Sequence, residues 1–301
     1  MLLQSNQFSL TCHLGISEAF WFGMWPGGES VWRSVSMSKS IRLQYIGVAV
    51  VILIFVLSLP ALASIISTKQ EIKIGRSSSQ QIEKQYGLVQ DPQLNRTIDA
   101  LGQRLASHGG RGIPYSFKVL NQDNVNAFAF PGGFVYVTKG ICKAMTVDQL
   151  SFVVGHEITH VERRHSVKAL ERSMAAQVGS SILMNFVKGN KNNVSTLVGM
   201  TNFVISNRYS QSQEREADEG GTDLMAQAGF DPAFAVDALN VLKKSDNGKG
   251  DSQFMNSLLS THPLTSERIE AAKGRVEGLR KAYKITPGSS AAKELTASTA
   301  Q

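Results

Sequence analysis

The sequence contains little that could build a disulfide framework. Of its 301 residues only two are cysteine, Cys12 and Cys142. Cys12 lies in an N-terminal stretch that we expect to be absent from the mature protein, so an exported form would hold no internal disulfide. Cys142, with Ile141 and Met145 nearby, is predicted to pack in the core rather than to act as a nucleophile. Side-chain packing, not cross-linking, must therefore hold this fold.

The sequence also lacks any run of Lys and Arg interleaved with aromatic residues. It has 31 Lys and Arg against 24 Asp and Glu, and only 8% of its residues are aromatic. The excess cations are spread along the chain, which is typical of a mildly basic, solvated surface rather than of a nucleic-acid groove. We therefore predict no nucleic-acid partner.

One long stretch lacks charge altogether. Residues 43–68 contain no Asp, Glu, Lys or Arg and follow a short basic region with Lys39 and Arg42. An Ala-Leu-Ala motif at the end of the most apolar part matches a signal-peptidase site, so we interpret 37–63 as a signal peptide cleaved before Ser64. The alternative is an uncleaved membrane anchor, because these 26 uncharged residues exceed the roughly 20 needed to span a bilayer as a helix.

The N-terminal segment determines the expected location. A cleaved signal peptide predicts an exported protein, periplasmic or otherwise extracytoplasmic, whereas an uncleaved helix at 37–63 predicts a membrane-anchored one. Membrane association is expected only through this segment. The residue directly after the cleavage motif is Ser64 and not cysteine, which argues against a lipid anchor there. Because signal peptides begin close to their basic region, we interpret Met37 as the true start and 1–36 as a non-native or disordered extension.

The remaining sequence predicts one mainly helical α+β domain from 69 to 285, followed by a disordered tail at 286–301. Asp91-Pro92 has the form of a helix start, and Leu94, Ile98, Leu101 and Leu105 follow at helical spacing. Short β-prone runs predict a small sheet with a hairpin, at 115–120, 127–130 and 134–138. Further helices are predicted at about 147–186, 194–225, 231–242 and 265–286.

The segment from His156 to His160 reads His-Glu-Ile-Thr-His, which is the pattern H-E-x-x-H. On a helix the i, i+4 spacing places both imidazoles on one face, where they can bind a single zinc ion. Glu157 lies between them and is the predicted general base, because it can take a proton from an attacking water. Residue type, spacing and helical context agree on this interpretation.

A catalytic zinc site with two histidines needs a third protein ligand. The metzincin continuation is excluded, since Arg163 and Ser166 occupy the positions of its glycine and third histidine. A carboxylate from a following helix is the remaining common solution, and Glu214 is the predicted ligand. Asp218, one turn later, is predicted to orient a ligand histidine, while Glu216 is expected to face solvent. This set predicts one zinc ion per chain.

Four blocks of the sequence resemble a known metallopeptidase family, in matching order and spacing. They are 126–133 with 135–138, the H-E-x-x-H segment with His165 beyond it, 214–218, and His262-Pro263 with Arg268. The family is that of the CAAX prenyl proteases and of the HtpX-like and BepA-like bacterial proteases, and the resemblance covers roughly residues 70 to 280. One departure is Gln211 after Ser210, where family members usually have arginine; it puts a local ion pair in doubt but not the metal site.

The resemblance implies a gluzincin-like fold with a small sheet beside the active-site helix. Within the last block, Arg268 is the candidate donor to the oxyanion. His262 precedes Pro263, which keeps it extended, so its ring is expected either to stabilise the oxyanion or to occupy the open metal position in a resting state. His165 is expected to have a structural or supporting role, because five residues beyond His160 it lies on a different helical face.

The predicted function is a zinc-dependent endopeptidase that cleaves exported or envelope proteins in protein quality control. Its partner would be a protein or peptide substrate, whose backbone could pair with an exposed strand edge near 126–130. The alternative is a zinc-stabilised chaperone or assembly factor for exported proteins. The presence of Glu157 disfavours that alternative as the sole role, because a binding protein needs no general base.

Overall fold

The computed structural model describes residues 19–21, 33–35, 64, 66–176, 194–245 and 258–299. The chain divides into two units, 1–63 and 64–301. In the first unit, β1 (Ala19–Trp21) pairs antiparallel with β2 (Arg33–Val35). The predicted signal peptide or anchor at 37–63 lies outside the described residues, and the assignment of 1–36 as an extension stays a prediction. No helix in the described ranges is both long and apolar enough to cross a membrane.

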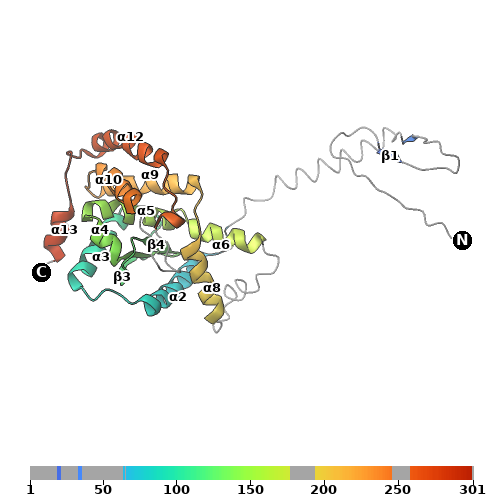
Figure 1. Ribbon diagram of the computed structural model, residues 1–301, viewed down its shortest axis with the longest axis horizontal. Coiled ribbons are helices and arrows are strands. Elements are labelled where there is room, and N and C mark those ends of the chain that lie inside the picture. Colours follow the sequence, from blue (N-terminus) through green and yellow to red (C-terminus); the bar gives the residue numbers. More distant parts are fainter. Residues whose placement is uncertain are drawn as a thin grey trace. The chain divides into compact units, whose positions relative to one another are not determined.

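The second unit is mainly helical, with one small sheet (Figure 1). In chain order its elements are α2 (Thr68–Tyr86), α3 (Pro92–Ala106), β3 (Ser116–Leu120), β4 (Ala127–Phe130), β5 (Phe134–Thr138), α4 (Lys139–Ala144), α5 (Val147–Glu162), α6 (His165–Ala176), α8 (Val194–Ser206), α9 (Gln211–Gln227), α10 (Ala233–Ser245), α11 (Leu258–Thr261), α12 (Ser266–Tyr283) and α13 (Ala292–Thr299). The predicted mainly helical α+β fold with a small sheet is confirmed.

The sheet has the strand order β3-β5-β4, with β3 parallel and β4 antiparallel to β5. The predicted hairpin is the β4–β5 pair. Its turn needs positive φ angles, 78° at Gly132 and 97° at Gly133, which glycine adopts without steric cost. The order leaves β4 at one edge of the sheet.

Side chains alternate between the two faces of the sheet, because successive residues of a strand point in opposite directions. Ala127 and Ala129 belong to the main core with α3 and α5, whereas Phe128 and Phe130 pack in a second cluster with α2 and α8. The sheet is therefore covered by helices on both faces.

Helix α5 is the central element of the domain, and Figure 1 shows it between β4 and α9. It begins with a capping box, in which the Thr146 hydroxyl accepts from the Gln149 N–H and the Gln149 side chain accepts from the Thr146 N–H. Every residue from Leu150 to Val161 is buried. Side chains on all faces of this helix are therefore held by neighbouring elements.

Two predicted helices are wrong in their extent. The helix expected to run from 147 to 186 ends at Glu162, where Arg164 adopts a left-handed φ of 56°, and α6 begins at His165; residues 177–193 lie outside the described ranges. The helix expected at 194–225 is interrupted between α8 and α9, because Ser210 and Gln213 form a capping box that starts a new helix.

The C-terminal region also differs from the prediction of a disordered tail at 286–301. It contains α13, and Leu295 is buried in the main core. Arg104 of α3 forms an ion pair with Glu294, with 2.9 Å between nitrogen and oxygen. Leu295 packs in the core together with Ala291, and Ala292 packs against it. One leucine and two alanines among small polar residues give too weak an apolar pattern to predict this docking.

Candidate metal centre

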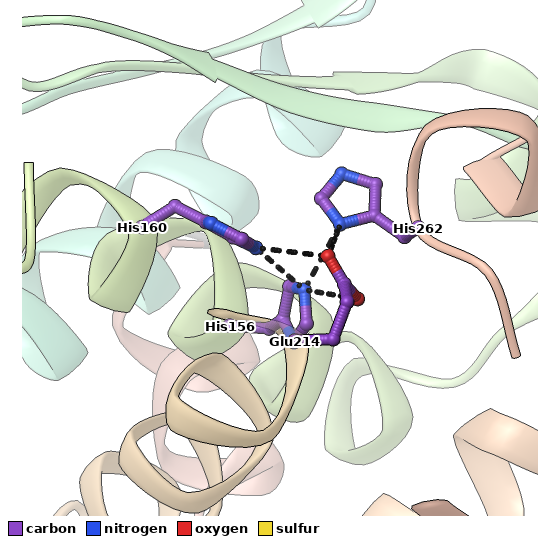
Figure 2. Close-up of side chains that lie close together, drawn as sticks. All are labelled: His156, His160, Glu214 and His262. Atoms are coloured by element: carbon purple, nitrogen blue, oxygen red, sulfur yellow. Dashed lines mark hydrogen bonds and ion pairs between the residues drawn. The ribbon is translucent and has the colours of Figure 1, made fainter. Parts of the chain in front are cut away.

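Four buried side chains converge on one point in the domain (Figure 2). His156 and His160 lie one turn apart on α5, Glu214 lies in the first turn of α9, and His262 follows α11. Their potential ligand atoms all lie within 4.8 Å of one another. Sequence reasoning had assigned the first three as metal ligands and His262 as a neighbour of the metal, and the structure brings all four together.

The distances in this cluster fit a single ion. The Nε2 atoms of His156 and His160 are 3.0 Å apart, and each lies 3.6 Å from an oxygen of Glu214. Two nitrogen ligands of a tetrahedral zinc ion lie roughly 3.3 Å apart, since each Zn–N bond is about 2.0–2.1 Å. Nδ1 of His262 is 2.9 Å from Glu214 Oε1 and 3.2 Å from His156 Nε2. The four side chains are buried, and imidazole nitrogens and carboxylate oxygens are ligands that zinc takes in proteins.

Glu157 lies beside this cluster and is only 1% exposed. Its Oε1 has no hydrogen-bond partner among the described residues, and Nε2 of the His262 ring lies 3.6 Å from it. Burial raises the pKa of the Glu157 carboxyl above its usual value, although the neighbouring histidines oppose this. A carboxylate with a raised pKa is better matched to accept and return a proton near neutral pH.

The carboxylate of Asp218 contacts His156, which is the contact expected if Asp218 orients a ligand histidine. Its Oδ1 is 3.0 Å from His156 Nδ1, so the other ring nitrogen of His156 faces the cluster. Arg268 holds the same carboxylate through Nε and Nη2, at 2.6 and 2.7 Å. Burial alone would raise the pKa of the Asp218 carboxyl, but hydrogen bonds from His156 and Arg268 bring it below its usual value.

The contacts of Arg268 differ from those expected of an oxyanion donor, the role that the sequence predicts for it. Besides Asp218, it contacts Glu214 Oε2 at 2.8 Å and donates to the carbonyl oxygen of Pro263 at 2.9 Å. All three of its guanidinium nitrogens are thus engaged with the protein. This geometry favours Arg268 as a positioning residue for Asp218 and Glu214 over direct contact with an oxyanion.

His160 has a supporting set of its own, which the sequence reasoning assigned only in general terms. Nδ1 of His165 is 2.8 Å from His160 Nδ1, and its Nε2 lies 3.5 Å from an oxygen of Glu216. Burial lowers the pKa of His165 to about 4, so its neutral ring can accept from His160 and present its other N–H to Glu216. Glu216 is exposed as predicted, yet it is not remote from the site.

Tyr209 completes the packing around His160 and was not identified from the sequence. Its ring stacks on the His160 imidazole with a centroid distance of 3.9 Å, and its hydroxyl hydrogen-bonds Ser166 Oγ at 2.9 Å. Tyr209 lies in the short connection between α8 and α9, outside any periodic pattern. No sequence signal connected it to His160.

Comparison with known proteins adds an independent observation to this geometry. The family described as "Peptidase family M48" matches residues 90–276, which is more than half of the chain. The chain belongs to peptidase family M48. Membership confirms the family proposed from the sequence blocks and, with the cluster in Figure 2, the predicted zinc cofactor. The roles of individual residues in this M48 site stay predictions.

Several curated relatives of this M48 chain carry protease names. The beta-barrel assembly-enhancing protease of Escherichia coli (strain K12) is 33% identical over 228 residues, covering 72% of this chain and 46% of the relative. Metalloprotease LoiP of the same organism is 29% identical over 186 residues, with 61% and 69% covered. The mitochondrial metalloendopeptidase OMA1 of Arabidopsis thaliana is 29% identical over 177 residues, with 58% and 34% covered. The chain thus spans about half the length of the first relative.

Proposed function

We propose that this chain is a zinc-dependent endopeptidase that hydrolyses peptide bonds of exported or envelope proteins. The observation that carries the proposal is the buried Glu157 carboxylate, one oxygen of which has no hydrogen-bond partner in the described part of the chain. Burying a carboxylate without full hydrogen bonding is costly. Glu157 lies beside the four-residue cluster, which supports a role in proton transfer. Such a role explains why a residue that lowers the stability of the fold stands at this position.

Each residue of the site has a distinct part in the proposed reaction. His156, His160 and Glu214 would hold the zinc ion, which would act as a Lewis acid toward the peptide carbonyl and lower the pKa of a water molecule. Glu157 accepts the proton of the attacking water and returns it to the leaving amine. His262, whose Nδ1 lies 2.9 Å from Glu214 Oε1, would either stabilise the oxyanion or occupy the open metal position in a resting state.

Strand β4 lies at the edge of the sheet, but all four of its residues are buried, so the exposed strand edge expected near 126–130 for binding a substrate backbone is not found. Thr138 donates its N–H to the carbonyl of Asn126 at 3.0 Å, and in an antiparallel pair the residues that face the partner strand alternate. Ala127 and Ala129 therefore direct their backbone groups away from β5, and the N–H of Ala127 is already capped by Asn126 Oδ1 at 2.9 Å. Ala129 is only 3% exposed, so these outward-directed backbone groups are not open to an added peptide strand.

The relatives and the N-terminal segment support a cellular location for this activity. One relative is named for enhancing beta-barrel assembly, and the uncharged stretch at 43–68 is typical of an export signal or an anchor. The proposed location is extracytoplasmic, in the periplasm or at a membrane, and the proposed role is protein quality control. The words "assembly-enhancing" in that name support a second candidate function, assembly assistance by a zinc-stabilised fold, while the word "protease" supports the first.

Replacement of Glu157 by glutamine separates the two candidate functions. The variant removes the base but keeps every ligand, so about one zinc per chain should remain while cleavage of a denatured protein falls by roughly 10²- to 10⁴-fold. Glu270→Gln, on the exposed face of α12, is the matched control and should behave like the unchanged protein. Equal hydrolysis by Glu157→Gln would favour assembly assistance, and absence of zinc after purification without a chelator would overturn the proposal.

A further inference from the structure

A small pocket with apolar walls opens beside the metal centre. Its apolar walls include Val153 of α5, Leu239 and Leu242 of α10, Leu259 of α11 and Leu264 shortly after α11. All five belong to the main core or pack against it. At one end, however, the pocket is bounded by polar side chains of the metal centre: His156, Glu157, His262 and Arg268. Its apolar side is therefore continuous with the place where a substrate would react.

The polar end of the pocket consists of groups already committed to the site. His156 and His262 belong to the four-residue cluster, and the guanidinium of Arg268 is engaged with Asp218 and Glu214. Of the residues that line the pocket, Glu157 alone has a buried side-chain oxygen without a hydrogen-bond partner in the described part of the chain. Among the described residues that line the pocket, Arg268 is the one Lys or Arg, and its guanidinium is already engaged. Because Glu157 is needed for proton transfer, the pocket suits an aliphatic side chain.

The size of the pocket limits which aliphatic side chain fits. It encloses about 10 Å³, which is close to the smallest space that holds one water-sized group. A methyl group is of similar size, so alanine fits without movement of the walls. Leu259 and Leu264 are only partly buried, and a small shift of either would make room for valine. Larger side chains would require the walls to separate, at the cost of core packing.

We propose that this pocket is a specificity subsite that selects a small aliphatic side chain at one of the two positions flanking the cleaved bond. The proposal rests on the endopeptidase function proposed above and specifies which substrates that site prefers. Leu259 and Leu264 are its size-determining residues. Shortening either side chain enlarges the pocket, and one methylene in an apolar pocket changes discrimination by roughly 10- to 200-fold.

The test is a digest of a denatured protein mixture by the zinc-loaded full chain, with cleavage sites mapped by mass spectrometry. Alanine and valine should be enriched at one flanking position. Leu259→Ala and Leu264→Ala should shift that position towards leucine, methionine and phenylalanine, changing the ratio of kcat/KM for leucine over alanine peptides by about tenfold or more. Leu94→Ala is the matched control, because Leu94 is also a partly buried leucine against the main core but does not line the pocket.

Binding provides a readout that does not depend on hydrolysis. The zinc-loaded Glu157→Gln variant should bind peptides with alanine at the selected position more tightly than peptides with aspartate or arginine there, and Leu259→Ala should reverse the order of alanine and leucine. Failure of the wild type to cleave, with this binding order intact, would remove the endopeptidase function but keep the subsite. Enrichment of charged residues, or a preference unaltered by Leu259→Ala and Leu264→Ala, would overturn the subsite.

Discussion

Replacement of Asp218 by asparagine tests how the metal centre is oriented. The Asp218 carboxylate contacts His156 Nδ1 at 3.0 Å and two nitrogens of Arg268 at 2.6 and 2.7 Å. An amide cannot accept on both sides, since its NH₂ group must face either a ring N–H or a guanidinium. Loss of such outer support lowers metal affinity by roughly 10- to 100-fold, which corresponds to about 1.4 to 2.8 kcal/mol.

The same substitution should also destabilise the fold. Arg268 is 11% exposed, so Asp218→Asn leaves a buried guanidinium with Glu214 as its remaining anionic partner. Breaking a buried ion pair from one side costs about 3 to 5 kcal/mol. Much of this loss should vanish when Arg268 is replaced as well, so a double-mutant cycle with Arg268→Gln should show a coupling of about 1 to 3 kcal/mol.

Two measurements check this prediction. Competition with a chromophoric chelator gives the zinc affinity, and urea unfolding of the zinc-free protein gives the free energy of unfolding. Asp237→Asn is the matched control, because Asp237 is exposed on α10. Zinc affinity within twofold of wild type, together with additive effects of Asp218→Asn and Arg268→Gln, would refute the reasoning.

The remaining predictions concern the support of His160 and the docking of the C-terminal segment. His165→Ala should lower zinc affinity by roughly tenfold. His165→Gln should restore part of this affinity by supplying an acceptor for His160, and Glu216→Gln should change it by less than about threefold because its amide oxygen still accepts. Competition with a chelator measures the zinc affinity of all three variants. Asp231→Asn should lower the free energy of unfolding by about 1.5 to 3 kcal/mol near neutral pH. Burial would raise the pKa of the Asp231 carboxyl, but hydrogen bonds, chiefly from Arg280, lower it below its usual value. Its contribution is therefore present above about pH 4 and lost as pH falls through the folded-state pKa, so urea unfolding in acid should show the difference from wild type shrinking.

Features with a local signal were predictable from the sequence. The strands at 127–130 and 134–138 match β4 and β5, because a Pro-Gly-Gly turn separates two short β-prone runs. The helix after Asp91 begins where its cap and proline indicate. His156 and His160 converge because their i, i+4 spacing on a helix requires it.

Features that depend on distant partners were not predictable. The fork of Arg268 on Asp218 spans 50 residues of sequence, so its role as a positioning residue emerged only from the fold. Helix α2 carries a buried face of small residues, including Gly75, Ser78 and Ser79, which resembles a polar surface in sequence. A Cβ at Gly75 would lie 1.7 Å from the carbonyl oxygen of Pro131, so this face is small because the helix lies directly against the β4–β5 turn.

The end of α5 shows how such distant contacts reach the metal centre. Arg164 holds a left-handed conformation that costs roughly 1 to 2 kcal/mol for a residue with a side chain. Its guanidinium donates to Glu71 of α2 at 3.0 Å, and Arg111 donates to the same carboxylate at 2.7 and 2.8 Å. Glu71 is fully buried, so releasing Arg164 would remove one of the cationic partners of a buried carboxylate. The free-energy cost of that loss outweighs the cost of the left-handed backbone at Arg164. The turn that brings His165 back to His160 is thus stabilised by a residue 93 positions earlier in the chain than Arg164, on a helix that contributes nothing to the four-residue cluster itself.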